Sequence, residues 1–172
     1  GVFLSCVLSM VRSSTAEPPP TQIALTAAER DRCLSVLRSG LASTEFWPSM
    51  HAAEALTLAG HQADVLAALQ DRLPQETDDQ HRCGLARELV RAGDRSVLPV
   101  LTRILNDVQS KGRVHAAESL YKIGEVPTDR SLVEALSQKE NLPLRLMSAA
   151  AFARKGCRSA RTVLRTSLAS ED

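Results

Sequence analysis

The chain has 172 residues, the length of one domain, with 24 Leu and 23 Ala against 3 Ile and 5 aromatic residues. That bias excludes a β-rich fold, because strands recruit β-branched and aromatic side chains, and a hydrophobic content of 44% argues against disorder. A net charge of +1, from 21 basic and 20 acidic residues, gives no bulk attraction to nucleic acids or membranes.

Residues 1–11 are almost all apolar or small, and the first charge of the chain is Arg12. Small residues follow, with Ser14 and Ala16 at the −3 and −1 positions of a signal-peptidase site. We therefore expect residues 1–16 to be a secretory leader, and the protein to be exported to a periplasmic or other extracytoplasmic space. In the alternative, the protein is cytoplasmic and this stretch is an apolar helix that packs on the domain. The stretch is too short to cross a bilayer as a helix.

A proline-rich stretch separates this segment from the rest of the chain. The prolines at 18–20 lack backbone donors and fix φ, which predicts an extended linker over residues 17–22. A single domain is expected over residues 23–169. No two cysteines are spaced as in a metal or redox motif. We expect the three cysteines of this domain to be buried or half-buried apolar residues: Cys33, Cys83 and Cys157.

The first element of the domain is a predicted helix over residues 26–39. Thr26 and Glu29 are spaced as in a capping box, and Gly40 follows the last expected helical position. This helix is expected to cap the first repeat, with a buried face made by Cys33, Val36 and Leu37. Trp47, at the start of the next element, is expected to anchor the first repeat against it.

A repeat of 31 to 33 residues runs through the rest of the domain, marked by four glycines: Gly60, Gly93, Gly124 and Gly156. Each ends a segment with apolar residues at helical spacing, four, seven and ten positions before the glycine. These three columns are Leu56, Leu89, Leu120 and Phe152; Ala53, Ala86, Ala117 and Ala149; and Met50, Cys83, Val114 and Leu146. Glycine suits the residue after a helix, because the left-handed conformation costs it nothing.

A second apolar stripe follows each glycine, as in Leu98, Leu101 and Leu105, in Leu132 and Leu136, and in Leu164 and Leu168. Each unit therefore predicts two antiparallel helices with a tight turn at the glycine. The expected repeats span residues 46–74, 78–106, 111–138 and 141–169. Candidate N-caps are Asp94 or Ser96, Thr128 and Asn141. The expected fold is all-α, with about four helix pairs and an N-terminal capping helix.

Two segments carry the same local pattern: Met50-His51-Ala52-Ala53-Glu54-Ala55-Leu56 and Val114-His115-Ala116-Ala117-Glu118-Ser119-Leu120. They resemble HEAT repeats, and more narrowly the short HEAT-like repeats named after phycobilin lyases, over residues 46–168. The resemblance implies a right-handed α–α superhelix, a HEAT-like solenoid, whose second helices line a concave face. It also implies binding to other macromolecules, since few such modules act on bilins, metals or DNA.

Two pairs of metal-ligating residue types recur three positions apart: His51 with Glu54, and His115 with Glu118. The HEAT-like deoxyhypusine hydroxylases bind two irons through adjacent His-Glu dipeptides. Here the equivalent dipeptides are Met50-His51 and Val114-His115, so that motif is broken. The pairs also lie two repeats apart, about 20 Å in a regular stack of helices. We therefore predict no metal and no other cofactor, and expect these histidines to bond locally.

The C-terminal repeat is basic, with six cations and no acid between residues 141 and 170: Arg145, Arg154, Lys155, Arg158, Arg161 and Arg165. The last three share one helix face at i, i+3 and i+7. HEAT-like DNA glycosylases use a basic concave surface, but ten positions after the glycines the column is mixed: Gln70, Arg103, Glu134 and Thr166. Phosphate tracking needs a continuous positive stripe. The sequence thus favours an acidic protein partner, with Arg103 and Arg130 as further candidate contacts.

The function these patterns favour is a non-catalytic scaffold that binds another protein or another domain of a longer chain. No serine–histidine or paired-carboxylate arrangement can be assigned from spacing, and no small-molecule substrate can be identified. The alternatives are an enzyme, a lyase-type or metal-binding subunit on the same repeat fold, and, with less support, a nucleic-acid-binding module.

Overall fold

The computed structural model describes residues 25–169, and all regular structure in that range is helical. The expected leader, the expected linker and the first two residues of the expected domain lie outside it. In chain order the helices are α1 (Ala27–Leu41), α2 (Phe46–Leu58), α3 (Gln62–Leu69), α4 (Asp79–Ala92), α5 (Leu98–Asn106), α6 (Arg113–Ile123), α7 (Ser131–Leu136), α8 (Leu142–Arg154) and α9 (Arg158–Leu168). Short 3₁₀ turns, Leu73–Gln75 and Arg95–Val97, precede α4 and α5.

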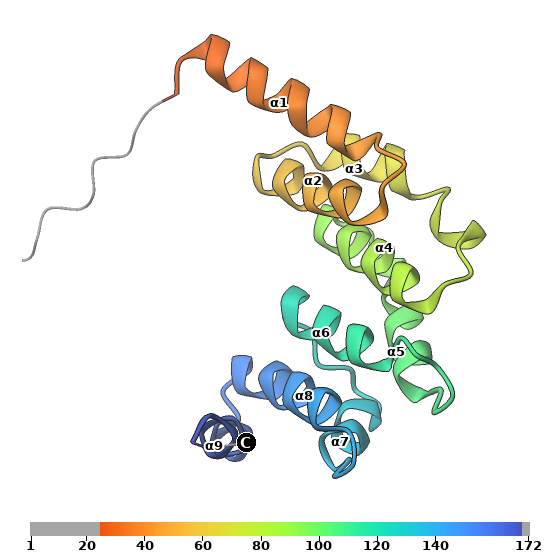
Figure 1. Cartoon of the computed structure of the whole chain (residues 1–172), viewed down its shortest axis with the longest axis vertical. Coiled ribbons are helices and arrows are strands. Elements are labelled where there is room, and N and C mark those ends of the chain that lie inside the picture. The colour runs from red at the N-terminus through yellow and green to blue at the C-terminus, as the bar shows by residue number, and fades with distance from the viewer. Residues whose placement is uncertain (1–24, 170–172) are drawn as a thin grey trace, which may run out of the picture.

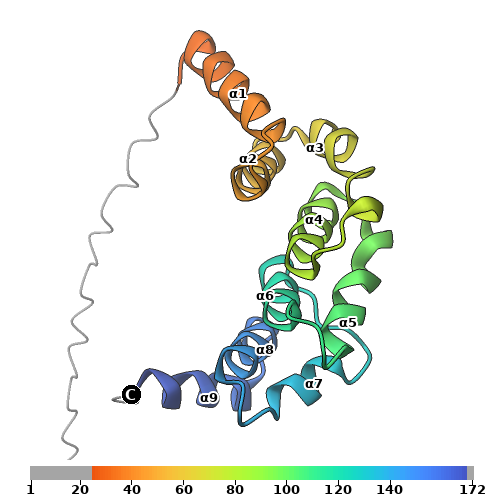
Figure 2. The same ribbon diagram turned by 45° about the vertical axis from the view of Figure 1, so that its right-hand side comes forward.

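The helices form a curved stack of two rows (Figures 1 and 2). Helices α2, α4, α6 and α8 follow one another along the inner side of the arc, and α3, α5 and α7 lie along the outer side. Helix α1 stands at one end and α9 at the other. The predicted all-α solenoid is therefore confirmed. Among these helices, none is long and apolar enough to cross a membrane.

The four repeated glycines all have positive φ, at +88°, +115°, +71° and +93° in chain order. Gly93 and Gly124 are the left-handed C-caps of α4 and α6, and their N–H groups bond to carbonyls in the last helical turn. The inner row thus turns outward after each helix at the residue type that tolerates this conformation.

The apolar columns before the glycines form the core between the rows. Leu56, Leu89 and Leu120 have no exposed surface, and the same holds for all four members of the alanine column. Because alanine ends at Cβ, this column lets neighbouring inner helices approach closely. The predicted core columns are confirmed at these positions. Phe152, in the last repeat, is only partly buried.

The pairing of helices differs from the expected one at α6 and α7, whereas α4 packs on α5 and α8 packs on α9 as expected. Helix α7 packs on α8 and makes little contact with α6, and the inner helices are those that precede the glycines. We expected the second helix of each repeat, the one after the glycine, to line the concave side. The structure places the first helix of each repeat there instead, so this expectation is wrong. Helix α3 packs on both α2 and α4, and α5 packs on both α4 and α6, whereas α7 packs on α8, which also packs on α9.

Helix α1 has the predicted capping box but another buried face. Thr26 and Glu29 bond reciprocally, and the helix runs through Gly40, whose missing Cβ would lie 3.1 Å from that of Ala52. Cys33 is exposed and Val36 is 65% exposed, so the buried face expected for α1 is wrong at these two positions, whereas Leu37 is half-buried as expected. The residues that pack toward α2 are Leu34, Leu37 and Leu41, spaced i, i+3 and i+7 on one side of the helix.

Two expectations near the other end are also wrong. Thr128 does not cap a helix, because α7 begins at Ser131 and Asp129 accepts from the Ser131 backbone N–H. Leu168 is 87% exposed, because α9, the last described helix, packs mainly on α8 and leaves its last turn uncovered. Asn141 does cap α8, accepting from the backbone N–H of Leu144.

Candidate functional site

Helix α9 carries three arginines on the side away from α8. Ala160 is buried toward the domain, whereas Arg158, Arg161 and Arg165 are exposed. With Thr162 they line a shallow depression. None of the three forms an ion pair with any residue in the range 25–169. Their shared face is the one that their spacing predicts, and we call it the α9 arginine face.

The other two candidate arginines lie elsewhere. Arg103 is exposed on α5 and Arg130 is exposed just before α7. Both helices belong to the outer row, on the opposite side of α8 from α9 (Figure 2). The structure therefore does not join them to the α9 arginine face.

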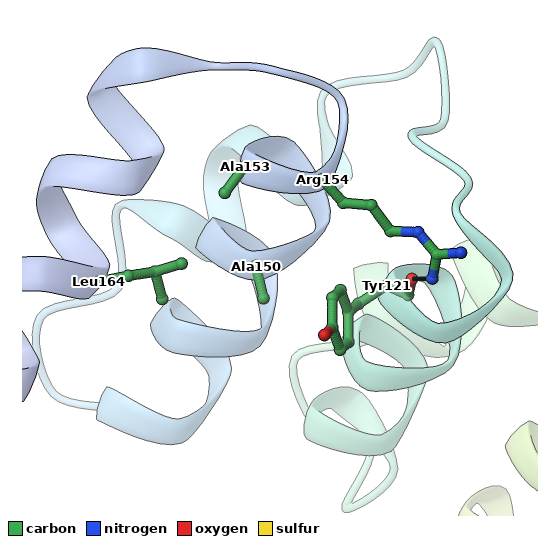
Figure 3. A pocket seen from close by; sticks show the side chains of 5 residues that line it. All are labelled: Tyr121, Ala150, Ala153, Arg154 and Leu164. Carbon is green, nitrogen blue, oxygen red and sulfur yellow. Dashed lines mark hydrogen bonds between the residues drawn. The ribbon is translucent and has the colours of Figure 1, made fainter. Parts of the chain in front are cut away.

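A groove of about 440 Å³ opens between α6, α8 and α9 (Figure 3). Tyr121 and Leu164 stand on its two sides, and Ala150 and Ala153 form its floor. Arg154 lies beside the ring of Tyr121, with its guanidinium carbon 5.9 Å from the ring centroid. We call this the α6–α8–α9 groove.

Arg154 is held in place by the end of α6. Its Nη1 donates to the carbonyls of Tyr121 and Lys122, at 2.8 and 2.9 Å. These carbonyls are in the last turn of the helix, where a cation complements the helix dipole. Spacing along the sequence does not predict this groove, because Tyr121 and Arg154 come from different repeats and different columns.

The inner row is crossed by a network of ion pairs. Glu88 of α4 has no exposed surface and accepts from Arg87 at 2.6 Å and from Arg91 at 3.0 Å. Arg91 also reaches Glu54 of α2, at 2.8 Å. The network therefore ties α2 to α4 through side chains that neutralise one another, and we call it the α4 ion network.

A smaller cluster lies on α6. Glu118 pairs with Lys122 at 2.9 Å and lies 3.6 Å from His115. Burial opposes its ionisation, but the hydrogen bond and charge of Lys122, with the nearby charges of His115 and Arg87, outweigh burial and lower the pKa of Glu118.

The two His–Glu pairs therefore have different partners. Glu54 binds Arg91 rather than His51, and His51 is exposed, whereas His115 and Glu118 do lie together. In residues 25–169, no group of three or more His, Cys, Asp or Glu side chains is arranged to hold a metal ion.

An aromatic cluster joins the start of the inner helices. Phe46 stacks on His81 at 3.8 Å, and Trp47 stacks on His115 with ring centroids 6.1 Å apart. A Cβ at Gly84 would lie 3.0 Å from the Phe46 ring, so this glycine admits the ring. Trp47 is 39% exposed and reaches across α4 to α6. Its expected role as an anchor against the capping helix is therefore wrong.

Comparison with known families gives one match. The family described as HEAT repeats matches residues 66–153, which are 88 of the 172 residues. The match begins within α3 and ends within α8. It does not distinguish the phycobilin-lyase type from other HEAT repeats. No curated protein and no solved structure matches the chain.

Proposed function

This chain belongs to the HEAT-repeat family, and on that basis we propose that it is a non-catalytic scaffold that binds other proteins. HEAT repeats generally mediate protein interactions, because stacked helices present one extended surface. The proposed contact is the α9 arginine face, which docks an acidic surface of a partner protein or of another domain.

The observation that carries this proposal is the exposure of Arg158, Arg161 and Arg165 without an acidic counterpart in the described range. The other arginine-rich part of the structure, the α4 ion network, is internally paired. Three solvated arginines on one face do little for stability, and arginine is enriched in protein interfaces. Like charges so close together also create a local positive field that attracts acidic partners.

The test is a charge reversal of Arg158, Arg161 and Arg165 to Glu, followed by affinity capture of partners from the source organism with quantitative mass spectrometry. We expect the partners recovered by the parent chain to be lost. Far-ultraviolet circular dichroism and melting temperature should stay close to the parent values.

The matched control reverses three exposed cations that are not among the candidate contacts: Arg30, Lys111 and Lys139. It makes the same change in net charge and should retain partner capture. Equal losses in both variants would assign binding to net charge, and unchanged capture by the α9 variant would refute the proposed contact.

We also propose that the protein is exported and that residues 1–16 are removed. The apolar stretch followed by Ser14 and Ala16 supports this proposal. N-terminal sequencing of the protein from its native host should begin at or near Glu17. Recovery of residues 1–16 on a cytoplasmic protein would refute it.

A further inference from the structure

We infer that the α6–α8–α9 groove receives one bulky apolar side chain from an acidic segment of the partner. This inference rests on the proposed docking of an acidic protein at the α9 arginine face. It adds a second contact, which makes binding depend on the amino-acid sequence of the partner. The occupant is thus a peptide segment in which carboxylates flank an apolar anchor.

The lining of the groove selects an apolar side chain. The side chains of Ala150 and Ala153 end at Cβ and so leave space between the larger side chains of Tyr121 and Leu164, which lie on either side (Figure 3). Leu168, one turn beyond Leu164 on the same helix, is 87% exposed and extends the apolar rim. Leaving these surfaces in water is unfavourable, and an aliphatic or aromatic side chain from a partner would cover them.

The rim of the groove selects acidic flanks. Arg154 stands on the α6 side, fixed by its bonds to two carbonyls of α6. Arg161 lies one turn before Leu164 on α9, but with Arg158 and Arg165 it lines the neighbouring depression rather than the groove. A carboxylate on the α6 side of the anchor therefore meets the guanidinium of Arg154, and a carboxylate further along the segment meets the α9 arginine face, both as charged hydrogen bonds.

The charge of the surrounding segment points to a protein rather than a nucleic acid. Residues 141–170 contain six cations and no acid, which favours an anionic ligand of either class. A nucleic acid needs a continuous cationic track, but Arg103 belongs to α5 and Arg130 precedes α7, and both helices lie on the opposite side of α8 from α9. An apolar floor with Arg154 at one edge, next to the α9 arginine face, suits a peptide with an apolar anchor and acidic flanks.

The test uses a library of random peptides displayed on phage, panned against the full chain. We expect enriched peptides to share a Leu, Ile, Met, Phe or Trp with two or more Asp or Glu residues close to it. Synthetic versions are then titrated against Ala150→Leu, which fills the groove. Their affinity should fall at least tenfold.

The matched control, Ala67→Leu, adds the same side chain to an exposed position on α3 and should change affinity less than twofold. Ala153→Leu fills the same groove from another position and should repeat the tenfold loss, which guards against misfolding of one variant. Circular dichroism of each variant checks the helix content.

Other outcomes separate this inference from the proposed function. Acidic peptides that need Arg158, Arg161 and Arg165 but tolerate Ala150→Leu would overturn the groove and leave the docking face standing. Peptides indifferent to the charge reversal, or no enrichment at all, would overturn both. An oligothymidylate that binds more tightly than the selected peptides, and displaces them, would assign the surface to nucleic acid instead.

Discussion

Replacing Glu88 by Gln removes the negative charge at the centre of the α4 ion network, and we expect it to destabilise the fold by about 3–5 kcal/mol. Glu88 is fully buried, and its only described ionic partners are Arg87 and Arg91. Arg91 keeps Glu54 after the substitution, at 2.8 Å. Arg87 keeps no ion pair, only the more distant charge of Glu118, and with 6% of its side chain exposed it becomes a buried charge without a hydrogen-bonded carboxylate.

The size of this effect is large on the scale of a whole domain, since unfolding free energies are about 5–15 kcal/mol. For a domain of this length each kcal/mol lowers the melting temperature by about 2–4 °C, so we expect a fall of about 6–20 °C. Urea unfolding followed by circular dichroism gives the free energy directly, provided that the slope is unchanged.

Two further variants show whether the buried charge is the cause. Glu54→Gln removes a partner that is 37% exposed and should cost at most about 1 kcal/mol. The double variant Arg87→Met with Glu88→Leu removes both buried charges and should recover most of the loss. A Glu88→Gln protein within about 1 kcal/mol of the parent would refute the reasoning, because Arg87 would then have found another partner or water.

Three further predictions concern the repeat and the cysteines. Leu89→Ala and Leu120→Ala should each cost about 2–5 kcal/mol in urea unfolding, since both side chains are fully buried. Gly93→Val should cost about 1–2 kcal/mol from backbone strain alone, because φ is +115° and nothing lies within 4 Å of the added Cβ; a parent-like melting curve would contradict the inferred turn. Iodoacetamide at neutral pH should label Cys157 and spare Cys83 in a peptide-mapping experiment. Burial raises the pKa of Cys83 to about 12, whereas the hydrogen bond with Ser159 lowers the pKa of Cys157 and so increases its thiolate fraction; equal labelling would contradict this.

The fold was predictable because its signals are local and repeated. A glycine that must have positive φ, preceded by leucine and alanine at helical spacing, identifies a helix end without knowledge of the neighbours. Four copies of that pattern fix the number of inner helices. The pattern does not indicate which outer helix each inner helix packs on, because one outer helix precedes it in the chain and another helix follows it. The expected concave side was wrong for that reason.

The two end helices were harder to predict for a related reason. Cys33 and Val36 have the spacing of a buried face, as do Leu34 and Leu37, and only the position of α2 decides between them. On α9 the spacing of the arginines was informative. A helix face that carries only charged residues is exposed to solvent, whichever helix packs on the opposite face. The groove beside it depends on side chains 33 residues apart, Tyr121 and Arg154.

The location of that groove follows from a break in the repeat. Six positions before the glycines stand Glu54, Arg87, Glu118 and Ala150, and two positions before them stand Leu58, Arg91, Lys122 and Arg154. In the first three inner helices the first of these columns is charged throughout and alternates in sign, and the second is apolar in α2 and basic in α4 and α6. Their charges are paired within the array. In α8 the charged position of the first column is held by Ala150. Arg154 then has no carboxylate on its own helix, turns to the carbonyls of α6, and leaves the space above the alanine open. An alanine in a column that is otherwise charged thus contributes both to the hollow and to the unneutralised cation at its edge.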